Sequence, residues 1–189
     1  MRKLLYFAVM AAALVMLVPA GVRAAEKSGT PVNLQNPGFE ADSENPWYWW
    51  GDAGTGTYGV STYKHSGAKS VEIVADRRDY TTVGILQDFV CAPGDEVTAS
   101  AWVMSPEASP LTNSDAFVRI EFWGADVINP TIALESPHLT GSFNSWTESS
   151  VTGKVPEGTT KAKVGLFIWN PGTGHSGTVY FDDVVVTKK

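Results

Sequence analysis

Apolar and polar residues alternate with a period of two along much of this chain, which is the pattern of β-strands with one buried face. The alternation is clearest in 97–104 and 116–123. The residues expected to point towards a core from these segments are Val97, Ala99, Ala101, Val103, Val118, Ile120 and Phe122. Each strand therefore also has a second face of mixed character, made of Thr98, Ser100, Trp102 and Met104 or of Arg119, Glu121 and Trp123.

The same pattern predicts most of the remaining strands. They are expected at 58–63, 71–75, 81–90, 146–152, 162–169 and 178–187, with a short one near 132–134. Turns rich in Gly and Pro separate them, and 105–115 is expected to be a Pro/Ser-rich loop. No segment shows sustained helical periodicity. About eight to ten short strands of this kind predict an all-β domain, either a sandwich or a barrel.

Four consecutive aromatic residues, Trp47-Tyr48-Trp49-Trp50, interrupt this pattern. An aromatic residue at every position does not fit a half-buried strand with one wet face. We therefore expect some of these rings to face outwards or to cover an edge of the domain.

The N-terminus has the organisation of a secretory signal peptide. A basic start, Met1-Arg2-Lys3, precedes an apolar run over 4–18, and Val22-Arg23-Ala24 fits a cleavage site. The run is shorter than the roughly 20 residues that a spanning helix needs. We predict a signal peptide at 1–24, a flexible lead at 25–32 and one domain at 33–189, in a secreted or extracytoplasmic protein without membrane insertion.

The charge of the chain limits its partners. The net charge of −6 becomes −9 once Arg2, Lys3 and Arg23 are removed with the signal peptide. Such a surface repels nucleic acid and anionic lipid, and a neutral ligand or a cation suits it better.

Cysteine contributes no internal disulfide, because Cys91 is the only one in the sequence. We expect it to be a small buried apolar residue at a strand end, with a reactive thiol as the alternative.

An ordered set of short motifs resembles the cellulase-type carbohydrate-binding modules, like those of families four, nine, sixteen and twenty-two. The motifs are Asn36-Pro37-Gly38-Phe39-Glu40, His65-Ser66-Gly67, Gln87, Pro93-Gly94, Ser100-Ala101-Trp102-Val103, Trp146, Val155-Pro156-Glu157-Gly158 and Phe181-Asp182-Asp183-Val184. The resemblance implies a galactose-binding-like jelly roll, a two-sheet antiparallel β-sandwich with one concave sheet. It also implies a ligand such as a β-glucan, xylan or mannan. Such modules are usually attached to an enzyme, whereas here we expect the module to stand alone.

The resemblance further implies a structural calcium ion. Its side-chain ligands map onto Glu40 and Asp182, and the carbonyl ligands map onto Ser66 and Lys69, with Asn36 or Gly38 as further candidates. Calcium takes six to eight oxygen ligands, which suits such a mixture. The alternative is that both acids are merely polar residues at strand ends.

A sugar-binding sheet needs aromatic side chains for the C–H faces of the sugar rings and polar side chains for their hydroxyls. The predicted ligand-binding residues are Trp102, Trp123, Trp169, Trp50, Arg119, Glu121 and Gln87. Each Trp has the alternative of being a buried packing residue. Arg119 and Glu121 have the alternative of an ion pair across a wet sheet face, and Gln87 that of a structural role.

Nothing in the sequence assembles a catalytic site. Zinc motifs, nucleophile elbows and phosphate loops are absent, and His65, His138 and His175 lie in turns or irregular stretches. We predict a monomeric, secreted, non-catalytic protein that binds a polysaccharide or oligosaccharide. An envelope structural or adhesive protein is the alternative, followed by a polysaccharide lyase or hydrolase, which would need a base or two suitably spaced carboxylates.

Overall fold

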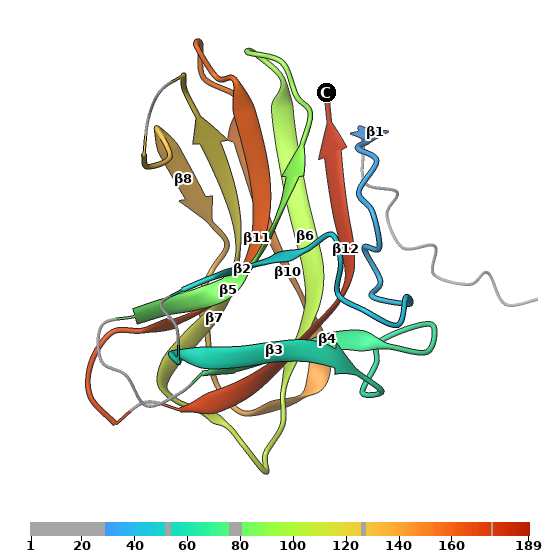
Figure 1. Ribbon diagram of the computed structural model, residues 1–189, viewed down its shortest axis with the longest axis vertical. Coiled ribbons are helices and arrows are strands. Elements are labelled where there is room, and N and C mark those ends of the chain that lie inside the picture. Colours follow the sequence, from blue (N-terminus) through green and yellow to red (C-terminus); the bar gives the residue numbers. More distant parts are fainter. Residues whose placement is uncertain (1–28, 52–53, 76–80, 126–127, 175) are drawn as a thin grey trace, which may run out of the picture.

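Two antiparallel sheets pack face to face in this protein (Figure 1). The computed structural model describes residues 29–51, 54–75, 81–125, 128–174 and 176–189. Within these ranges there is no helix, and so none that could cross a membrane. The predicted signal peptide and residues 25–28 of the predicted lead lie outside the described residues.

Each sheet contains six strands among the described residues. Sheet A consists, in spatial order, of β10 (Phe143–Lys154), β6 (Glu96–Ser105), β12 (Gly177–Lys188), β4 (Ser70–Ala75) and β3 (Gly56–Ser61), with β1 (Thr30–Pro31) beside β12. Sheet B consists of β2 (Tyr48–Trp50), β5 (Thr81–Phe89), β11 (Lys161–Asn170), β7 (Leu111–Trp123) and β8 (Ile132–Glu135), with β9 (Leu139–Gly141) beside β7. The structure therefore confirms the all-β class and shows that the domain is a sandwich and not a barrel.

The core lies between the sheets and uses the side-chain alternation that the sequence shows. From β6 and β7 it takes all seven residues predicted to point inwards, and each of them is fully buried. β5, β11, β12 and β4 contribute further aliphatic side chains in the same alternating way. Removal of these groups from water is the main favourable term for folding, at about 25 cal/mol per Å² of apolar surface.

Strand boundaries differ from the prediction where pairing extends a strand. β7 begins at Leu111, inside the predicted loop, because its first part pairs with β9. Thr30 and Pro31 pair with β12, and the Val32 N–H donates to the Val186 carbonyl over 2.8 Å. The paired chain thus begins three residues before the predicted domain boundary.

Three residues of the aromatic run form the edge strand β2, and two of its rings face outwards, as expected. β2 pairs with residues 84–86 of β5, and its rings alternate between the two faces of sheet B. Trp47, just before β2, is buried against Phe39, with ring centroids 5.4 Å apart. Trp49 packs against the core, while Tyr48 and Trp50 point outwards. A strand of aromatic residues is tolerated here because other side chains partly cover its outer face.

The segment 36–40 packs against the last strand, as its motif suggested. The Val184 N–H donates to the Pro37 carbonyl over 2.9 Å, and the Trp47 indole N–H donates to the Asn36 carbonyl over 3.2 Å. Asn36 and Phe39 both have positive φ angles, of 47° and 56°, so this is a tight turn with strained non-glycine residues. The turn joins the start of the domain to β12.

The Gln87 side chain holds the segment before this turn against sheet B. Its side-chain amide accepts a hydrogen bond from the Gln35 N–H over 2.7 Å and donates to the Gln35 carbonyl over 2.8 Å. The side chain thus replaces a neighbouring strand along the part of β5 that β2 does not cover. Both of its polar atoms are engaged within the fold, which agrees with the structural alternative for this residue.

We predict that Gln87→Met lowers the free energy of unfolding by about 1–3 kcal/mol, because the Gln35 N–H and carbonyl lose their partners. Chemical denaturation measures this change. The matched control is Gln35→Met, which alters an exposed side chain and keeps both backbone bonds, so its effect is expected within about 0.5 kcal/mol. An equal effect of the two substitutions would contradict this role of Gln87.

Candidate functional site

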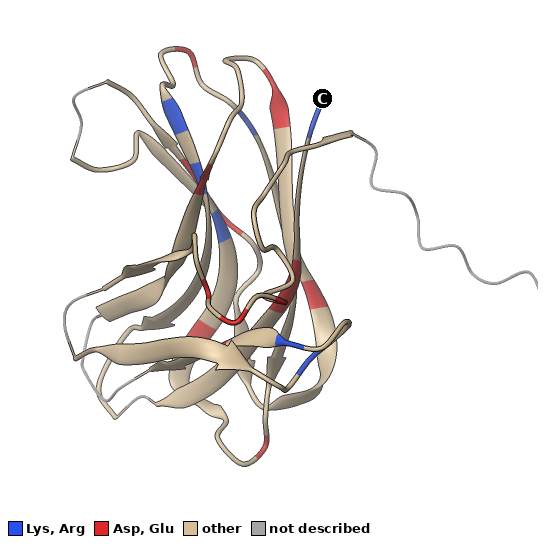
Figure 2. Ribbon diagram, turned by 45° about the vertical axis from the view of Figure 1, so that its right-hand side comes forward, with Lys and Arg blue, Asp and Glu red and all other residues tan. Residues whose placement is uncertain are grey.

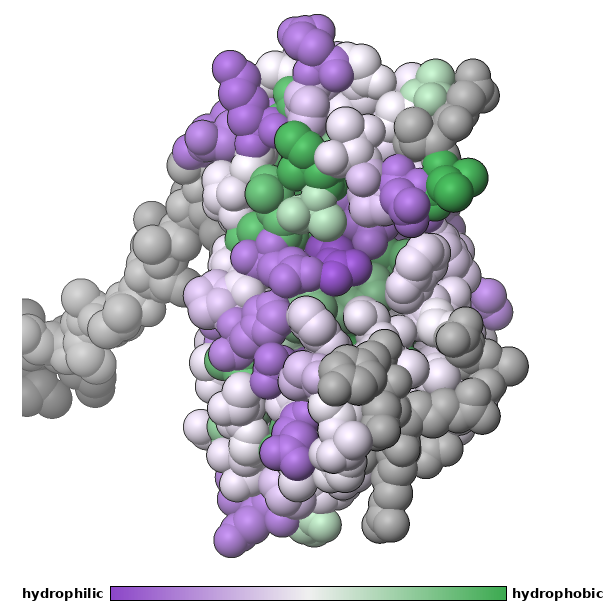
Figure 3. All heavy atoms as spheres, turned by 90° about the vertical axis from the view of Figure 1, so that its left-hand side faces the viewer, coloured by the Kyte–Doolittle hydropathy of each residue, from purple (hydrophilic) through white to green (hydrophobic). Residues whose placement is uncertain are grey.

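The face of sheet B that points away from the core carries a mixture of aromatic and charged side chains. We call it the outer face of sheet B. Its members are Tyr48, Trp50, Thr82, Leu86, Asp88, Asp115, Phe117, Arg119, Glu121, Trp123, Lys161, Lys163, Phe167, Trp169 and, from β8, Glu135. Figure 3 views the side on which sheet B lies and shows a hollowed band of strongly hydrophilic residues beside hydrophobic ones.

An apolar floor lies on the sheet itself. Leu86, Phe117 and Phe167 are fully buried and form a cluster separate from the main core. Glycines allow the Phe167 ring to lie flat: a Cβ on Gly84 or Gly165 would lie only 2.5 or 2.2 Å from its ring atoms. The sequence therefore places glycine on two adjacent strands where a side chain would lift this ring off the sheet.

Arg119 covers this floor. Its guanidinium carbon lies 4.6 Å from the centroid of the Phe167 ring and 5.3 Å from that of Phe117, which are cation–π distances. Its Nε and Nη2 donate to Glu135 over 3.0 and 2.5 Å, and Nη1 lies 3.4 Å from Glu121. The ion pair considered from the sequence exists, but Glu135 of β8 is the closer partner.

His138 extends the charged layer. Its ring stacks on Phe117 with centroids 4.4 Å apart, and its two nitrogens lie 3.1 Å from Asp115 and 3.1 Å from Glu135. Burial raises the pKa of Glu135, but hydrogen bonds and charge from Arg119 and His138 outweigh it and hold the pKa below its usual value. Arg119, Glu135 and His138 thus form a planar polar layer with little freedom to move.

Exposed aromatic rings stand beside this layer. Tyr48, Trp50 and Trp169 are 38%, 37% and 38% exposed. Trp123 is more covered, and its indole N–H donates to Glu121 over 3.0 Å. Burial first, and then the nearby Asp88, raise the pKa of Tyr48, whose hydroxyl donates to Asp88 over 2.8 Å.

Trp102 lies on the opposite side of the molecule. It belongs to β6 of sheet A and is the register partner of Asp182 and Glu148. The His65 ring covers it, with centroids 4.0 Å apart, and the edge of Trp146 lies 5.7 Å from His65. The structure therefore brings Arg119, Glu121, Trp123, Trp169 and Trp50 together and leaves Trp102 on the other face.

The two predicted metal ligands lie near one another beside Gly38. A Cβ on Gly38 would lie 3.8 Å from both Asp182 Oδ1 and Glu40 Cγ. Asp182 Oδ2 accepts hydrogen bonds from the N–H groups of His65 and Ser66, over 2.8 and 3.1 Å. The carboxylates thus close the 65–69 turn onto the first and last parts of the domain.

Ser66 and Lys69, predicted to offer carbonyl oxygens to the metal, instead donate N–H groups in the contacts that the structure describes. The N–H of Lys69 donates to Glu40 over 3.2 Å, and the Lys69 ammonium donates to the Glu40 and Ala41 carbonyls and to Asp42. Among the described residues no group of three or more His, Cys, Asp or Glu side chains is arranged to hold a metal. Carboxylate oxygens are ligands that calcium prefers, and in this structure those of Glu40 and Asp182 accept backbone N–H groups.

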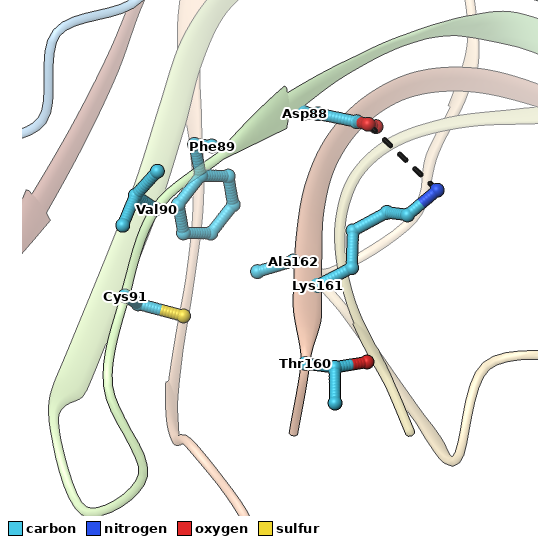
Figure 4. Close-up of a pocket in the computed structure, with 7 residues that line it drawn as sticks. All are labelled: Asp88, Phe89, Val90, Cys91, Thr160, Lys161 and Ala162. Carbon is cyan, nitrogen blue, oxygen red and sulfur yellow. Dashed lines mark ion pairs between the residues drawn. The ribbon is translucent and has the colours of Figure 1, made fainter. Parts of the chain in front are cut away.

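A hollow of about 260 Å³ opens at the end of the outer face of sheet B (Figure 4). Asp88 and Lys161 lie at one side of it, 3.8 Å apart, and the Phe89 ring and the Cys91 thiol point into it from the other. Burial raises the pKa of the Cys91 thiol, with Asp95 adding to the effect. A raised pKa argues against the reactive-thiol alternative.

Sequence reasoning missed several residues of the outer face of sheet B. Tyr48 was hidden in the aromatic run, Glu135 and His138 in a stretch that seemed irregular, and Lys163 among the polar positions of β11. Lys163 follows the two-residue alternation with Phe167 and Trp169, so this signal was available. Glu135 and His138 reach the face only through the pairing of β8 and β9 with β7.

No protein-family model matches this sequence, and neither does any curated protein. Solved structures do match. The second family 22 carbohydrate-binding module of Paenibacillus barcinonensis Xyn10C, a xylan-binding domain, has a TM-score of 0.59 and 22% identity, covering 81% of this chain and 98% of its own. Modules of families 61 and 16 match as well, the former in complex with beta-1,4-galactotriose.

Enzymes also match. The Stig cyclase Fisc of Fischerella sp. TAU has a TM-score of 0.61 and 16% identity, with 86% of this chain and 98% of that chain covered. The enzymatically active domain of bacteriophage CBA120 tailspike protein 4 has a TM-score of 0.62 and 11% identity, covering 82% of this chain. This chain spans 21% of the tailspike chain. At these identities the matches show the fold, which is the predicted β-sandwich of carbohydrate-binding modules.

Glu135 gives this layer a testable pH dependence. Its pKa is lower in the folded protein than its ordinary value of 4.5. Its contribution to stability is therefore complete above pH 4.5 and is lost as the pH falls through the folded-state pKa. We predict that Glu135→Gln is less stable than the wild type at pH 6 and that the difference shrinks by about pH 3 in urea denaturation.

The control for this experiment is Glu96→Gln. Glu96 pairs with Lys189 over 3.6 Å, and both side chains are more than half exposed, so little change is expected at either pH. A stability difference for Glu135→Gln that is the same at both pH values would contradict the lowered pKa.

Proposed function

We propose that this protein binds a polysaccharide or oligosaccharide, without catalysis, on the outer face of sheet B. The observation that carries this proposal is the exposure of Tyr48, Trp50 and Trp169 beside the fixed layer of Arg119 and Glu135. Sugar rings have apolar C–H faces that pack on aromatic rings and hydroxyls that need donors and acceptors at their edges. Both kinds of group are present on this one face.

The polar part of this face is pre-organised. Arg119 is held by two carboxylates and by the aromatic floor, so a ligand does not have to immobilise it. Immobilising a long side chain costs about 0.5–1.5 kcal/mol on binding, and this cost is avoided here. A fixed array of planar polar groups suits a ligand with hydroxyls at regular spacing.

The length of the face supports an extended ligand. Trp169 and Lys161 lie at the two ends of the outward positions of β11, eight residues apart, which corresponds to roughly 27 Å. Trp169 lies at one end of the face and Trp123 at the other. Trp50 and Tyr48 lie between them, because their partners on β5 are opposite Phe167 and Gly165. A chain of several sugar units could contact these rings in succession.

The state of Glu135 supports binding rather than hydrolysis. A glycosidase needs a carboxylic acid whose pKa is raised so that it can donate a proton. Arg119 and His138 shift the pKa of Glu135 in the opposite direction. The fold itself occurs both in xylan-binding and galactotriose-bound modules and in the cyclase and tailspike enzymes, so the argument against hydrolysis depends on the residues of this face.

Secretion and calcium binding are further parts of the proposal. The basic start, apolar run and cleavage site of 1–24 support export. Calcium at Glu40 and Asp182 is supported by the binding of both carboxylates to the same 65–69 turn and by the full burial of Asp182. Burial raises the pKa of Asp182, and a bound cation would offset that cost by stabilising the anion.

Binding is tested by affinity electrophoresis and calorimetry with a panel of soluble glucans, xylans, mannans and galactans. We predict that Trp50→Ala and Trp169→Ala each weaken binding by about tenfold or more, because exposed aromatic anchors carry a large share of binding energy. Tyr63→Ala is the matched control, since Tyr63 is exposed and stacks on Tyr180 of sheet A.

Three results would contradict the proposed function. Retardation by none of the glycans would favour the structural or adhesive alternative. Reducing ends released over time would favour an enzyme. Loss of binding with Tyr63→Ala, but not with the Trp variants, would place the site on sheet A.

Calcium is tested separately by thermal unfolding with and without a chelator. At a calcium concentration of about 100 times Kd, bound calcium adds about 2.7 kcal/mol of stability. Chelation should therefore lower Tm by roughly 5–10 °C. Asp182→Asn should remove this response, and Lys154→Gln, on the far strand of sheet A, should keep it. An unchanged Tm of the wild-type protein after chelation would refute the calcium site.

A further inference from the structure

Lys163 has an unusual place on the outer face of sheet B. It lies on β11 between Asp88 of β5 and Glu121 of β7, which are its register partners. The side chain is only 7% exposed, and its ammonium lies 4.3 Å from the centroid of the Trp123 ring and 5.5 Å from that of Tyr48. The rings attract the cation, but they do not accept conventional hydrogen bonds from it.

Within the described part of the chain, the Lys163 ammonium has no hydrogen bond and no carboxylate within ion-pair distance. The other basic groups of this face do have acidic partners: Arg119 binds Glu135 and Glu121, Lys161 lies 3.8 Å from Asp88, and His138 lies between two carboxylates. In Figure 2 basic and acidic residues accordingly lie close together in strands on the left of the view.

The carboxylates nearest to Lys163 are committed elsewhere. Asp88 accepts the Tyr48 hydroxyl and faces Lys161. Glu121 accepts the Trp123 indole N–H and faces Arg119. Both neighbouring acids therefore bind other donors, and among the described residues no carboxylate lies within ion-pair distance of the Lys163 ammonium.

An ammonium that is removed from water without an acceptor is costly. Among the described residues, the one fully buried side-chain polar atom without a partner is Ser105 Oγ. The Lys163 nitrogen is not such a fully buried atom, so it keeps some contact with solvent. The ammonium thus lies between two aromatic rings on the proposed binding face, and its N–H groups can donate to a ligand.

We propose that Lys163 binds the carboxylate of an acidic sugar, so that the ligand is a polysaccharide containing uronic acid. A carboxylate supplies both the hydrogen-bond acceptor and the charge that this ammonium lacks, and a hydroxyl supplies only the first. The proposal rests on the proposed function and narrows its ligand class. It also departs from the neutral ligand favoured by the net charge of −6, because Asp88 and Glu121 are engaged by other donors and lie beyond ion-pair distance of the Lys163 ammonium.

The experiment compares polymers that differ only in the carboxylate. Binding of the full-length secreted protein is measured by calorimetry for polygalacturonate, alginate and glucuronoxylan, and for the carboxyl-reduced form of each. We expect at least one acidic polymer to bind about tenfold more tightly than its reduced form at low salt. We expect Lys163→Met to abolish this preference, Lys163→Arg to retain it, and added salt to weaken it.

The outcomes separate this proposal from the proposed function. Binding of neutral polymers without any acid preference, or a preference that survives in Lys163→Met, would overturn the acidic-sugar proposal and leave carbohydrate binding intact. No binding of any polymer would overturn both. Circular dichroism and an unchanged thermal unfolding midpoint show that Lys163→Met is folded.

Discussion

The burial of apolar side chains on both faces of sheet B is the interaction on which the candidate site depends. β11 sends Val164, Leu166 and Ile168 into the core and Phe167 outwards, and all four are fully buried. The outward ring has no second sheet above it, so Arg119 covers it instead. A charged group in that place must itself be neutralised, and Glu135 and Glu121 meet this need. The polar surface is therefore held by the same packing that holds the core.

The sequence was sufficient for features that depend on one strand alone. The direction of a side chain follows from the pleat, so the inward residues of 97–104 and 116–123 were predicted correctly. The sequence was not sufficient for the choice of sheet, which depends on pairing between distant segments. Trp102 and Trp123 have the same local pattern, yet β6 pairs with β10 and β12, whereas β7 pairs with β11 and β8. Their separation onto opposite faces could not be read from either strand.

The partners of polar side chains could not be predicted from the sequence either, for a different reason. The chemistry of a carboxylate at a turn suits a cation, a backbone N–H group or both, and the sequence alone does not distinguish them. In the structure Glu40 and Asp182 accept backbone N–H groups of the 65–69 turn. The amide of Gln87 likewise could have faced a ligand, but it replaces a strand beside Gln35. Partner identity, and not residue type, decided these roles.

Charge balance divides the outer face of sheet B into two parts with different consequences for recognition. Around Arg119 every charge has an opposite charge within hydrogen-bond distance, so this part can orient hydroxyls but offers no net attraction to an ion. Within the described residues, the contacts of the Lys163 ammonium are with the Tyr48 and Trp123 rings. An unbalanced charge in a poorly hydrated place responds most strongly to an opposite charge. The proposed preference for acidic over neutral ligands therefore depends on this part of the face, and the proposed affinity for both depends on the aromatic rings.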